Sequence, residues 1–182
     1  MSSTSIDRIY RDIDQLLSLL ASTGEISLRS SADDTYRKSL LLSIASYFES
    51  QLTQIVIQFA EDKTCKRHIL VSLVRAKAIS RQYHTWFNWD GSNANTFFSL
   101  FGNEFKDIVS KVVKEDQGLE ASIKCFLELG RDRNRLVHQD YANFPLEKTS
   151  GEIYQSYQSA LRFVEWIPGA LTEYAVPAET QT

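Results

Sequence analysis

Residues 40–59 read LLLSIASYFESQLTQIVIQF, and this stretch sets the expectation for the fold class. Its large apolar side chains recur every three or four residues, at Leu40, Ile44, Phe48, Leu52, Val56 and Phe59. Residues with this spacing lie along one line of an α-helix, because the helix has 3.6 residues per turn. The stretch therefore predicts a long helix that buries one face, and the Ser- and Asp-rich residues 30–34 are expected to open it.

Apolar residues at helical spacing also occur on both sides of this stretch. The chain has only 7 glycines and 3 prolines, and it contains no useful run with the period of two that is typical of a strand. Further helices are expected at about 6–20, 66–86, 97–112, from about 119, and 149–166. We therefore predict an all-α, up-and-down bundle of about five to six helices.

Turn and capping residues predict several helix boundaries. Thr23-Gly24 should end the first helix, and residues 88–95 should form a turn around Asp90-Gly91. Thr149 and Glu152 form a capping box for the last helix, which Pro168-Gly169 should end or kink. In the helix at 66–86, the inward residues are expected to be Ile69, Leu70, Leu73 and Val74. The residues predicted to be buried together are Leu40, Ile44, Phe48, Leu52, Phe101, Phe105, Phe126 and Leu127.

The composition is that of an ordinary soluble protein, with 43% hydrophobic and 24% charged residues. Residues 1–182 are expected to form one helical domain, with an N-terminal helix at about 1–24, a core at 33–172 and a loose tail at 177–182. The net charge of −3 argues against bulk coating of nucleic acid, but it allows a local basic groove. No signal peptide or membrane span is recognised, so a cytoplasmic location is expected.

The stretch LGRDRNRLVHQDY, residues 129–141, is the best candidate for chemistry. It places three arginines within five residues, next to His138. Asn134 and His138 are four apart and lie on one helix face, whereas Arg133 and His138 are about 140° apart around a regular helix. Both can border one cleft only if the helix ends near His138, which Gln139-Asp140 permits.

An arginine and a histidine together suit cleavage of RNA without a metal. Histidine can accept or donate a proton near neutral pH, and arginine stabilises charge that develops on phosphate. Attack by the 2′-OH would restrict the reaction to RNA. A pair of these residues at a helix end more often caps backbone carbonyls or pairs with acidic residues, so spacing alone leaves that alternative open. The two cysteines, Cys65 and Cys125, are isolated, and no metal site or cofactor is expected.

The string R-N-x-x-x-H at Arg133–His138 resembles the signature of HEPN ribonucleases, a family found in bacterial toxins, antiphage systems and RNA-cutting CRISPR effectors. Ser46-Tyr47-Phe48-Glu49 is similar to the helix that packs on the catalytic helix in that family, and residues 93–95 are similar to the middle segment of its defence-linked subgroup. The resemblance implies catalysis by Arg133 and His138, support from Asn134, products with a 2′,3′-cyclic phosphate, and no metal. It also implies a homodimer in which both copies of these residues face one cleft.

One feature departs from the family pattern. A toxin branch has a tyrosine two residues after the histidine, which its antitoxin modifies. Here Tyr141 comes third, so control by nucleotidylation is in doubt.

Other side chains are weaker candidates for the site. Glu49 and Tyr47 are possible supporting residues. Glu49 could hold Arg133 or His138 in place, or could be a solvated surface carboxylate. Candidate RNA-binding residues are Arg131, Arg135, Arg67, Arg75, Lys77 and Arg81, although a basic run is often only a solvated helix face. The aromatic residues Tyr83, Trp86, Phe87 and Trp89 could stack on bases, but residues of this type more often close a core.

These features predict a metal-independent endoribonuclease that serves as a toxin or antiphage effector. Its partners would be RNA, a second copy of the chain, and an antitoxin or defence-system protein. The alternative is a HEPN-like module that has lost cleavage and binds RNA or a partner protein.

Overall fold

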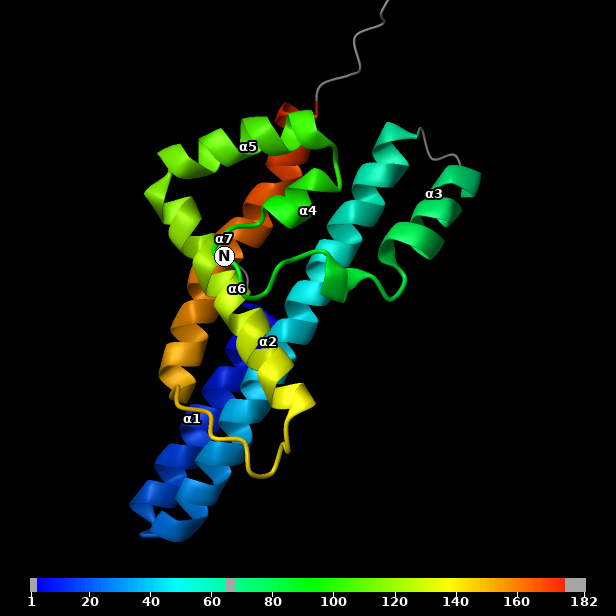
Figure 1. Cartoon of the computed structure of the whole chain (residues 1–182). Helices are drawn as coiled ribbons and strands as arrows, with labels where there is room; N and C mark the ends of the chain where they lie inside the picture. Colours follow the sequence, from blue (N-terminus) through cyan, green and yellow to red (C-terminus); the bar gives the residue numbers. More distant parts are fainter. Residues whose placement is uncertain (1–2, 65–67, 176–182) are drawn as a thin grey trace, which may run out of the picture.

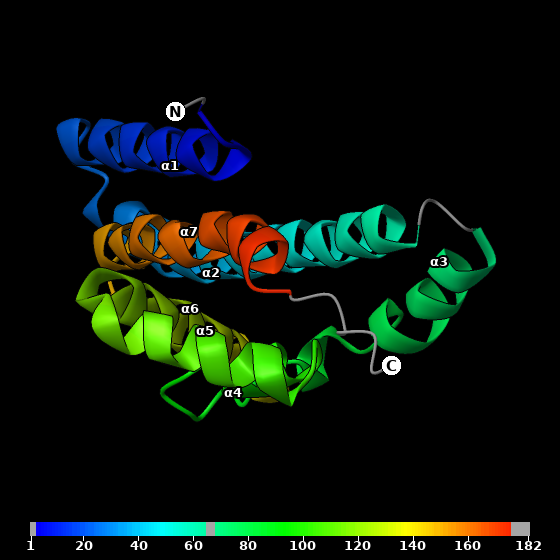
Figure 2. The ribbon, with the colours of Figure 1, turned by 90° about the horizontal axis from the view of Figure 1, so that it is seen from above.

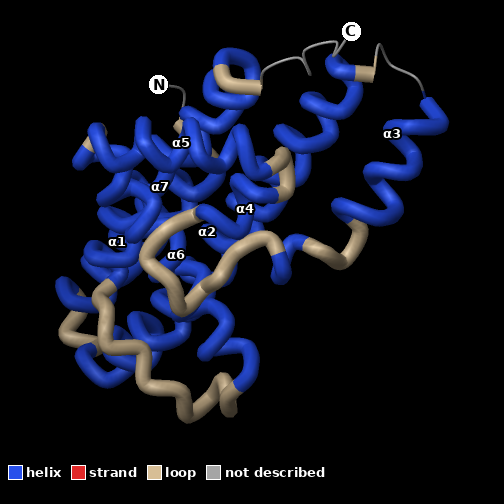
Figure 3. Tube along the Cα trace, turned by 45° about the horizontal axis from the view of Figure 1, so that its top comes forward, coloured by secondary structure: helices blue, strands red, loops and turns tan. Residues whose placement is uncertain are grey.

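The computed structural model describes residues 3–64 and 68–175, and within these ranges it contains seven α-helices and no strand (Figures 1 and 3). The helices are α1 (Ser5–Ser22), α2 (Ile26–Lys63), α3 (His68–Val74), α4 (Asn95–Ser99), α5 (Asn103–Glu115), α6 (Gln117–His138) and α7 (Ser150–Glu173). A π-helical turn, η1 (Arg75–Ile79), and a 3₁₀ turn, η2 (Tyr83–Thr85), follow α3. The prediction of an all-α bundle is confirmed.

The long helix α2 is the centre of the bundle. It packs against α1, α6 and α7, and α6 and α7 also pack closely against each other. Seen from above, α1 lies on one side of the α2–α7 pair and α6, α5 and α4 lie on the other (Figure 2). The far end of α2 contacts α3 and η1, whereas the first residues of α2, with Ile26 and Leu28 exposed, are left uncovered.

The predicted stripe on α2 forms the core. Leu40, Ile44 and Leu52 are completely buried and Phe48 is 2% exposed, while Phe126 on α6 packs on Phe48 with ring centroids 5.5 Å apart. Burial of each such side chain contributes about 1.5–3 kcal/mol. The other residues predicted for the core are also buried, apart from Phe101, which is half-buried.

The helix α2 is also apolar enough to cross a membrane by length and composition. One 18-residue window has a mean hydropathy of 1.3. Its packing against α1, α6 and α7 accounts for this composition, because a helix at the centre of a bundle needs apolar residues on several faces.

The structure confirms two predicted helix boundaries, the capping box at Thr149 and the end of the first helix at Thr23-Gly24, and it adds a capping box at Thr4. Thr4 and Thr149 each form a capping box, and the backbone N–H of Glu152 donates to the Thr149 hydroxyl at 3.2 Å. Gly24 ends the turn after α1 with a φ of +78°. The helix α7 continues through Pro168 to Glu173, whereas α2 begins at Ile26 rather than within residues 30–34.

The helix expected at 66–86 is wrong in its second half. Among the described residues of this range, a continuous helical run covers only 68–79. The chain then turns, with Arg81 in the left-handed region at a φ of 59°, before the short 3₁₀ turn η2. Buried Trp86 holds this turn by donating its indole N–H to the carbonyl of Ala78 at 3.0 Å. Burial of Trp86 in the core therefore outweighs the local preference of this segment for a continuous helix.

The apolar face of α3 is likewise not buried as expected. Ile69 is 85% exposed, Leu70 and Leu73 are exposed, and Val74 is half-buried, while Val71 is the buried residue. The exposure of these side chains follows from the position of α3, because α3 meets the bundle at α2 and at the adjoining turn η1. The predictions for residues 66 and 67 and for the tail at 177–182 concern positions outside the described residues.

The helix expected at 97–112 is divided into α4 and α5. Gly102 has a φ of +105°, a conformation that glycine adopts without the steric cost that other residues pay. The resulting corner allows Phe98 on α4 and Phe105 on α5 both to reach the core. This division explains why the bundle has seven α-helices rather than six.

Candidate active site

The candidate site lies where α6 ends. His138 is the last residue of the helix, and Gln139 leaves it in an extended conformation with a ψ of 174°. The side chain of Asp140 then accepts hydrogen bonds from the backbone N–H of Ala142 at 3.1 Å and from the amide of Asn143 at 2.7 Å. The helix end that Arg133 and His138 need in order to border one cleft is therefore present.

A pocket of about 470 Å³ opens beside this helix end. Its walls come from α2, from α6 and from the turn at residues 81–89. The residues that line it are Ala45, Phe48, Glu49, Arg81, Tyr83, His84, Trp89, Phe126, Leu129, Gly130, Arg133, Asn134 and His138. The structure thus brings Arg133, Asn134, His138 and Glu49 to one pocket.

Arg133 is held by its neighbour within this pocket. Its Nη1 donates to Oδ1 of Asn134 at 3.1 Å. The preceding carboxylate, Asp132, instead accepts from Lys148 at 2.7 Å on the α7 side of the helix. No ion pair to Arg133 is present among residues 3–64 and 68–175, so the guanidinium keeps donors for an incoming anion.

The pKa of the Tyr83 hydroxyl is affected by burial and by two charged residues that line the pocket. Burial, and after it the negative charge of Glu49, raise the pKa of its hydroxyl above the ordinary value of 10.0, whereas the positive charge of Arg133 lowers it. The hydroxyl therefore stays protonated at neutral pH and can act as a hydrogen-bond donor. Glu49 itself is exposed, with its side chain on the pocket wall.

The turn at 81–84 adds two residues that carry chemistry. Arg81 and His84 both line the pocket. A non-glycine residue in the left-handed region costs roughly 1–2 kcal/mol, so the surrounding contacts must hold Arg81 there. The sequence marks Arg81 only as part of a basic run, and it does not single out His84. No local signal marks His84, because the apolar spacing predicts a helix in this segment.

The four aromatic residues of this segment divide between core and pocket. Trp86 and Phe87 are 2% and 4% exposed and belong to the core, as favoured from the sequence. Tyr83 and Trp89 are half-buried and line the pocket. Trp89 also donates its indole N–H to the carbonyl of His84 at 3.0 Å, and so fixes one end of the turn.

Gly130 allows Trp89 to approach α6 closely. A Cβ atom at this position would collide with the six-membered ring of Trp89. The indole can therefore lie directly on the backbone of α6, one turn before Arg133. The pocket wall depends on this glycine.

A second hollow continues from the first past His138. The two share Trp89, Asn134 and His138, and the second adds Arg131 and Arg135. Arg131 lies 3.9 Å from Glu128, and the guanidinium of Arg135 lies over the ring of Phe144 at 5.8 Å. The two hollows form a groove with His138 in both parts. Arg81 and Arg133 line the first part, and Arg131, Arg135 and the acidic Asp90 line the second.

Other candidate residues are not brought to this groove. Tyr47 lies on another face of α2, with its ring 5.9 Å from that of Tyr157. Arg75 is exposed and pairs with Glu61 at 3.0 Å, and Lys77 is exposed outside both hollows. Arg67 lies outside the described residues.

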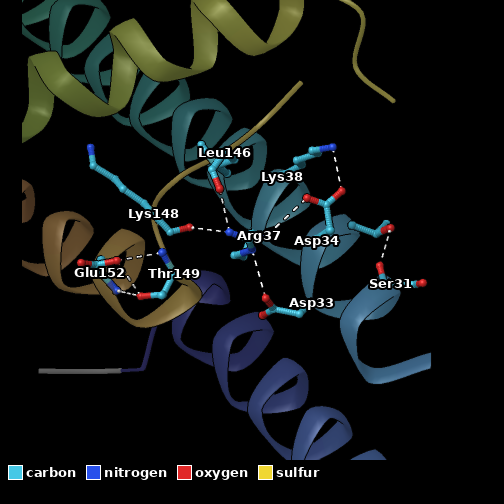
Figure 4. Close-up of polar contacts among 10 residues, drawn as sticks. Ser31, Asp33, Asp34, Arg37, Lys38, Leu146, Lys148, Thr149 and Glu152 are labelled. Carbon is cyan, nitrogen blue, oxygen red and sulfur yellow. Dashed lines mark hydrogen bonds and ion pairs between the residues drawn. The ribbon is translucent and has the colours of Figure 1, made fainter. Parts of the chain in front are cut away.

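The loop that follows His138 is anchored to the start of α2. Lys38, which is 2% exposed, donates from Nζ to the carbonyl of Tyr141 at 3.1 Å and pairs with Asp34 at 2.7 Å. Arg37 donates to the carbonyls of Leu146 at 2.7 Å and of Lys148 at 3.2 Å (Figure 4). These contacts restrain the backbone on the C-terminal side of His138.

Within the described part of the chain, no three His, Cys, Asp or Glu side chains come together as a metal ion would require. The pocket instead offers hydrogen-bond donors and proton-transfer groups. Such a set can bind a phosphate and move a proton to or from an oxygen next to it.

The chain was found to match a known protein family. The family described as RiboL-PSP-HEPN matches residues 7–173 of this chain. No curated protein and no solved structure matches it significantly.

Proposed function

The chain belongs to the RiboL-PSP-HEPN family, and from this premise we propose that it is a metal-independent endoribonuclease. The observation that carries the proposal is that Arg133, Asn134 and His138 line one pocket where α6 ends. A pair that merely capped the helix would have no need of a pocket of about 470 Å³ in front of it.

The proposed reaction begins with attack of a ribose 2′-OH on the adjacent phosphorus. His138 transfers a proton in this reaction, as imidazole does near neutral pH. Arg133 stabilises the negative charge that gathers on the phosphorane oxygens, and Asn134 holds the guanidinium through the 3.1 Å hydrogen bond. The products are a 2′,3′-cyclic phosphate and a 5′-hydroxyl.

The proposed substrate is single-stranded RNA lying in the groove that passes His138. Arg131 and Arg135 on one side, and Arg81 on the other, would contact backbone phosphates. Tyr83 and Trp89 offer partly exposed rings on which an unstacked base could lie. Because the net charge is −3, this local field would have to supply most of the electrostatic attraction.

We further propose a cytoplasmic toxin or antiphage effector that forms a homodimer and is controlled by an antitoxin or another defence-system protein. The family resemblance supports this role. Sedimentation at tens of micromolar tests the dimer, and a monomer with undiminished activity would contradict it. Expression in bacteria with and without a co-encoded neighbour tests the toxin role through growth arrest.

The central experiment measures cleavage of a labelled RNA by the purified chain in the presence of EDTA. We expect cleavage to persist and the products to carry cyclic phosphate ends. His138→Ala and Arg133→Ala should each lower the rate by about 10²-fold or more. His68→Ala serves as the control, since His68 is exposed on α3 and lies outside both hollows.

Two results would contradict this proposal. One is cleavage that appears only with added Mg²⁺, and the other is full activity in His138→Ala. A wild-type chain that binds RNA or a partner protein without cutting would favour an inactive binding module.

A further inference from the structure

We propose that His84 is a second proton-transfer residue of this site and shares the two proton transfers of RNA cleavage with His138. This inference rests on the proposed ribonuclease function. In the sequence His84 lies 54 residues before His138, at the edge of a segment expected to be helical. In the fold the two histidines line the same pocket.

The position of His84 makes it accessible to a substrate. Its side chain is exposed, whereas the neighbouring Trp86 and Phe87 are buried and anchor the turn in the core. Arg133 and His138 line the pocket from α6, and His84 lines it from the turn at residues 81–89. A phosphate bound by Arg133 in this pocket would therefore have two histidines near it, from two different elements.

The backbone around His84 is restrained by several hydrogen bonds. Its carbonyl accepts from the indole of Trp89 at 3.0 Å. The N–H groups of Thr85 and Trp86 donate to the carbonyls of Gln82 at 2.8 Å and of Tyr83 at 3.1 Å. A catalytic group needs such support, because misplacement by about 1 Å can cost 10²-fold in rate.

The chemistry requires two groups with opposite roles. The bond between O2′ and phosphorus forms while a neutral histidine takes the 2′-OH proton, and the bond between phosphorus and O5′ breaks while a protonated histidine gives its proton to O5′. Exchange with water then restores both histidines, so no further reactant is consumed. The ionisable and charged groups that face His84 in the pocket are Glu49 from α2, Arg81 and Tyr83 from its own turn, and Arg133 and His138 from α6.

This arrangement changes what a second copy of the chain must supply. With one histidine per chain, acid and base would have to come from two protomers. With His84 in the pocket, one chain provides both. Proton transfer then needs no histidine from a partner, whether or not the chain dimerises.

The first test compares His84→Ala and His84→Gln with wild type and with His68→Ala. We expect kcat to fall by about 10²- to 10⁴-fold in both His84 variants, with little change in KM. The wild-type pH–rate profile should be bell-shaped, and each His84 variant should lose one limb of the bell. Thermal unfolding controls for the fold, which should be unchanged because the side chain is exposed.

The second test uses an RNA whose scissile 5′-oxygen is replaced by sulfur, a leaving group that needs no proton. If His84 is the acid, this substrate restores the rate of His84→Ala and not that of His138→Ala. If His84 is the base, the substrate restores only His138→Ala. Rescue of neither variant, or of both alike, would contradict the division of roles.

The outcomes separate this inference from the proposed function. Wild-type cleavage together with a His84→Ala rate within about twofold of wild type overturns the role of His84 alone. A loss confined to KM makes His84 a binding residue and also overturns the inference. A wild-type chain that cuts no RNA overturns both.

Discussion

Replacement of Gly130 by alanine should destabilise the protein, although alanine normally favours a helix. In a helix interior this change contributes about 1 kcal/mol of stability through helix propensity. At Gly130 the new methyl group would collide with the ring of Trp89, and overpacking of this kind costs about 1–3 kcal/mol. The net loss of unfolding free energy should therefore be about 0–2 kcal/mol.

Gly169→Ala isolates the collision from the propensity gain. Gly169 also lies within a helix, α7, and apart from its chain neighbours and the adjacent backbone of α7 no atom lies within 4 Å of a Cβ built on it. The propensity term is similar in the two variants, so Gly130→Ala should be less stable than Gly169→Ala by the overpacking cost, about 1–3 kcal/mol. Urea unfolding measures this difference, and tryptophan fluorescence should change only in Gly130→Ala.

The same substitution should also lower cleavage. Displacement of Trp89 weakens its hydrogen bond to the carbonyl of His84 and moves one wall of the pocket. We expect a loss of about tenfold or more in kcat, because small displacements of reacting groups are costly. Equal stability of the Gly130→Ala and Gly169→Ala variants, with unchanged fluorescence, would refute the packing of Trp89 on Gly130.

Three further predictions concern Arg133, the anchored loop and pH. Arg133→Lys keeps the charge but loses the planar pair of donors, so cleavage assays should show a loss of at least tenfold, and wild-type rates would contradict a bidentate role. Lys38→Met removes the buried ammonium that binds the carbonyl of Tyr141 and should cost about 1–3 kcal/mol in urea unfolding; no change would show that the loop is held by other contacts. Burial raises the pKa of Asp7. Hydrogen bonds, first among them one from the backbone of Thr4, together lower it by more than burial raises it, so the pKa lies below the ordinary 3.8. A lowered folded-state pKa gives stability that is present above about pH 3.8 and lost as pH falls through the folded-state pKa, and Asp7→Asn should remove this part of the acid dependence of the melting temperature.

The sequence was most informative where the governing interactions are local. The stripe from Leu40 to Leu52 predicted a buried helix, because residues three or four apart share a helix face whatever surrounds them. The capping box of Thr149 and Glu152 predicted the start of α7 for the same reason. Arg133, Asn134 and His138 could be grouped in advance, since all three lie in the last two turns of one helix.

Local sequence patterns predict the structure less accurately where distant contacts compete with local preference. The π-helical turn and the left-handed Arg81 end a segment that its own residues would extend as helix, because Trp86 gains more by burial in the core. Ile69 has the spacing of an inward residue, yet it is exposed because no other element covers that face of α3. Periodicity shows which face of a helix is apolar, but not whether a neighbour exists.

The amino-acid sequence by itself thus determined the helical class, the main caps and the arginine, asparagine and histidine at the end of α6. Only the tertiary structure decided that Glu49, Arg81 and His84 share a pocket with them. These residues come from segments more than 30 residues apart, and their approach depends on how α2 and α6 pack and on Gly130 admitting Trp89. Such proximity results from packing across the bundle, to which no short-range spacing rule applies.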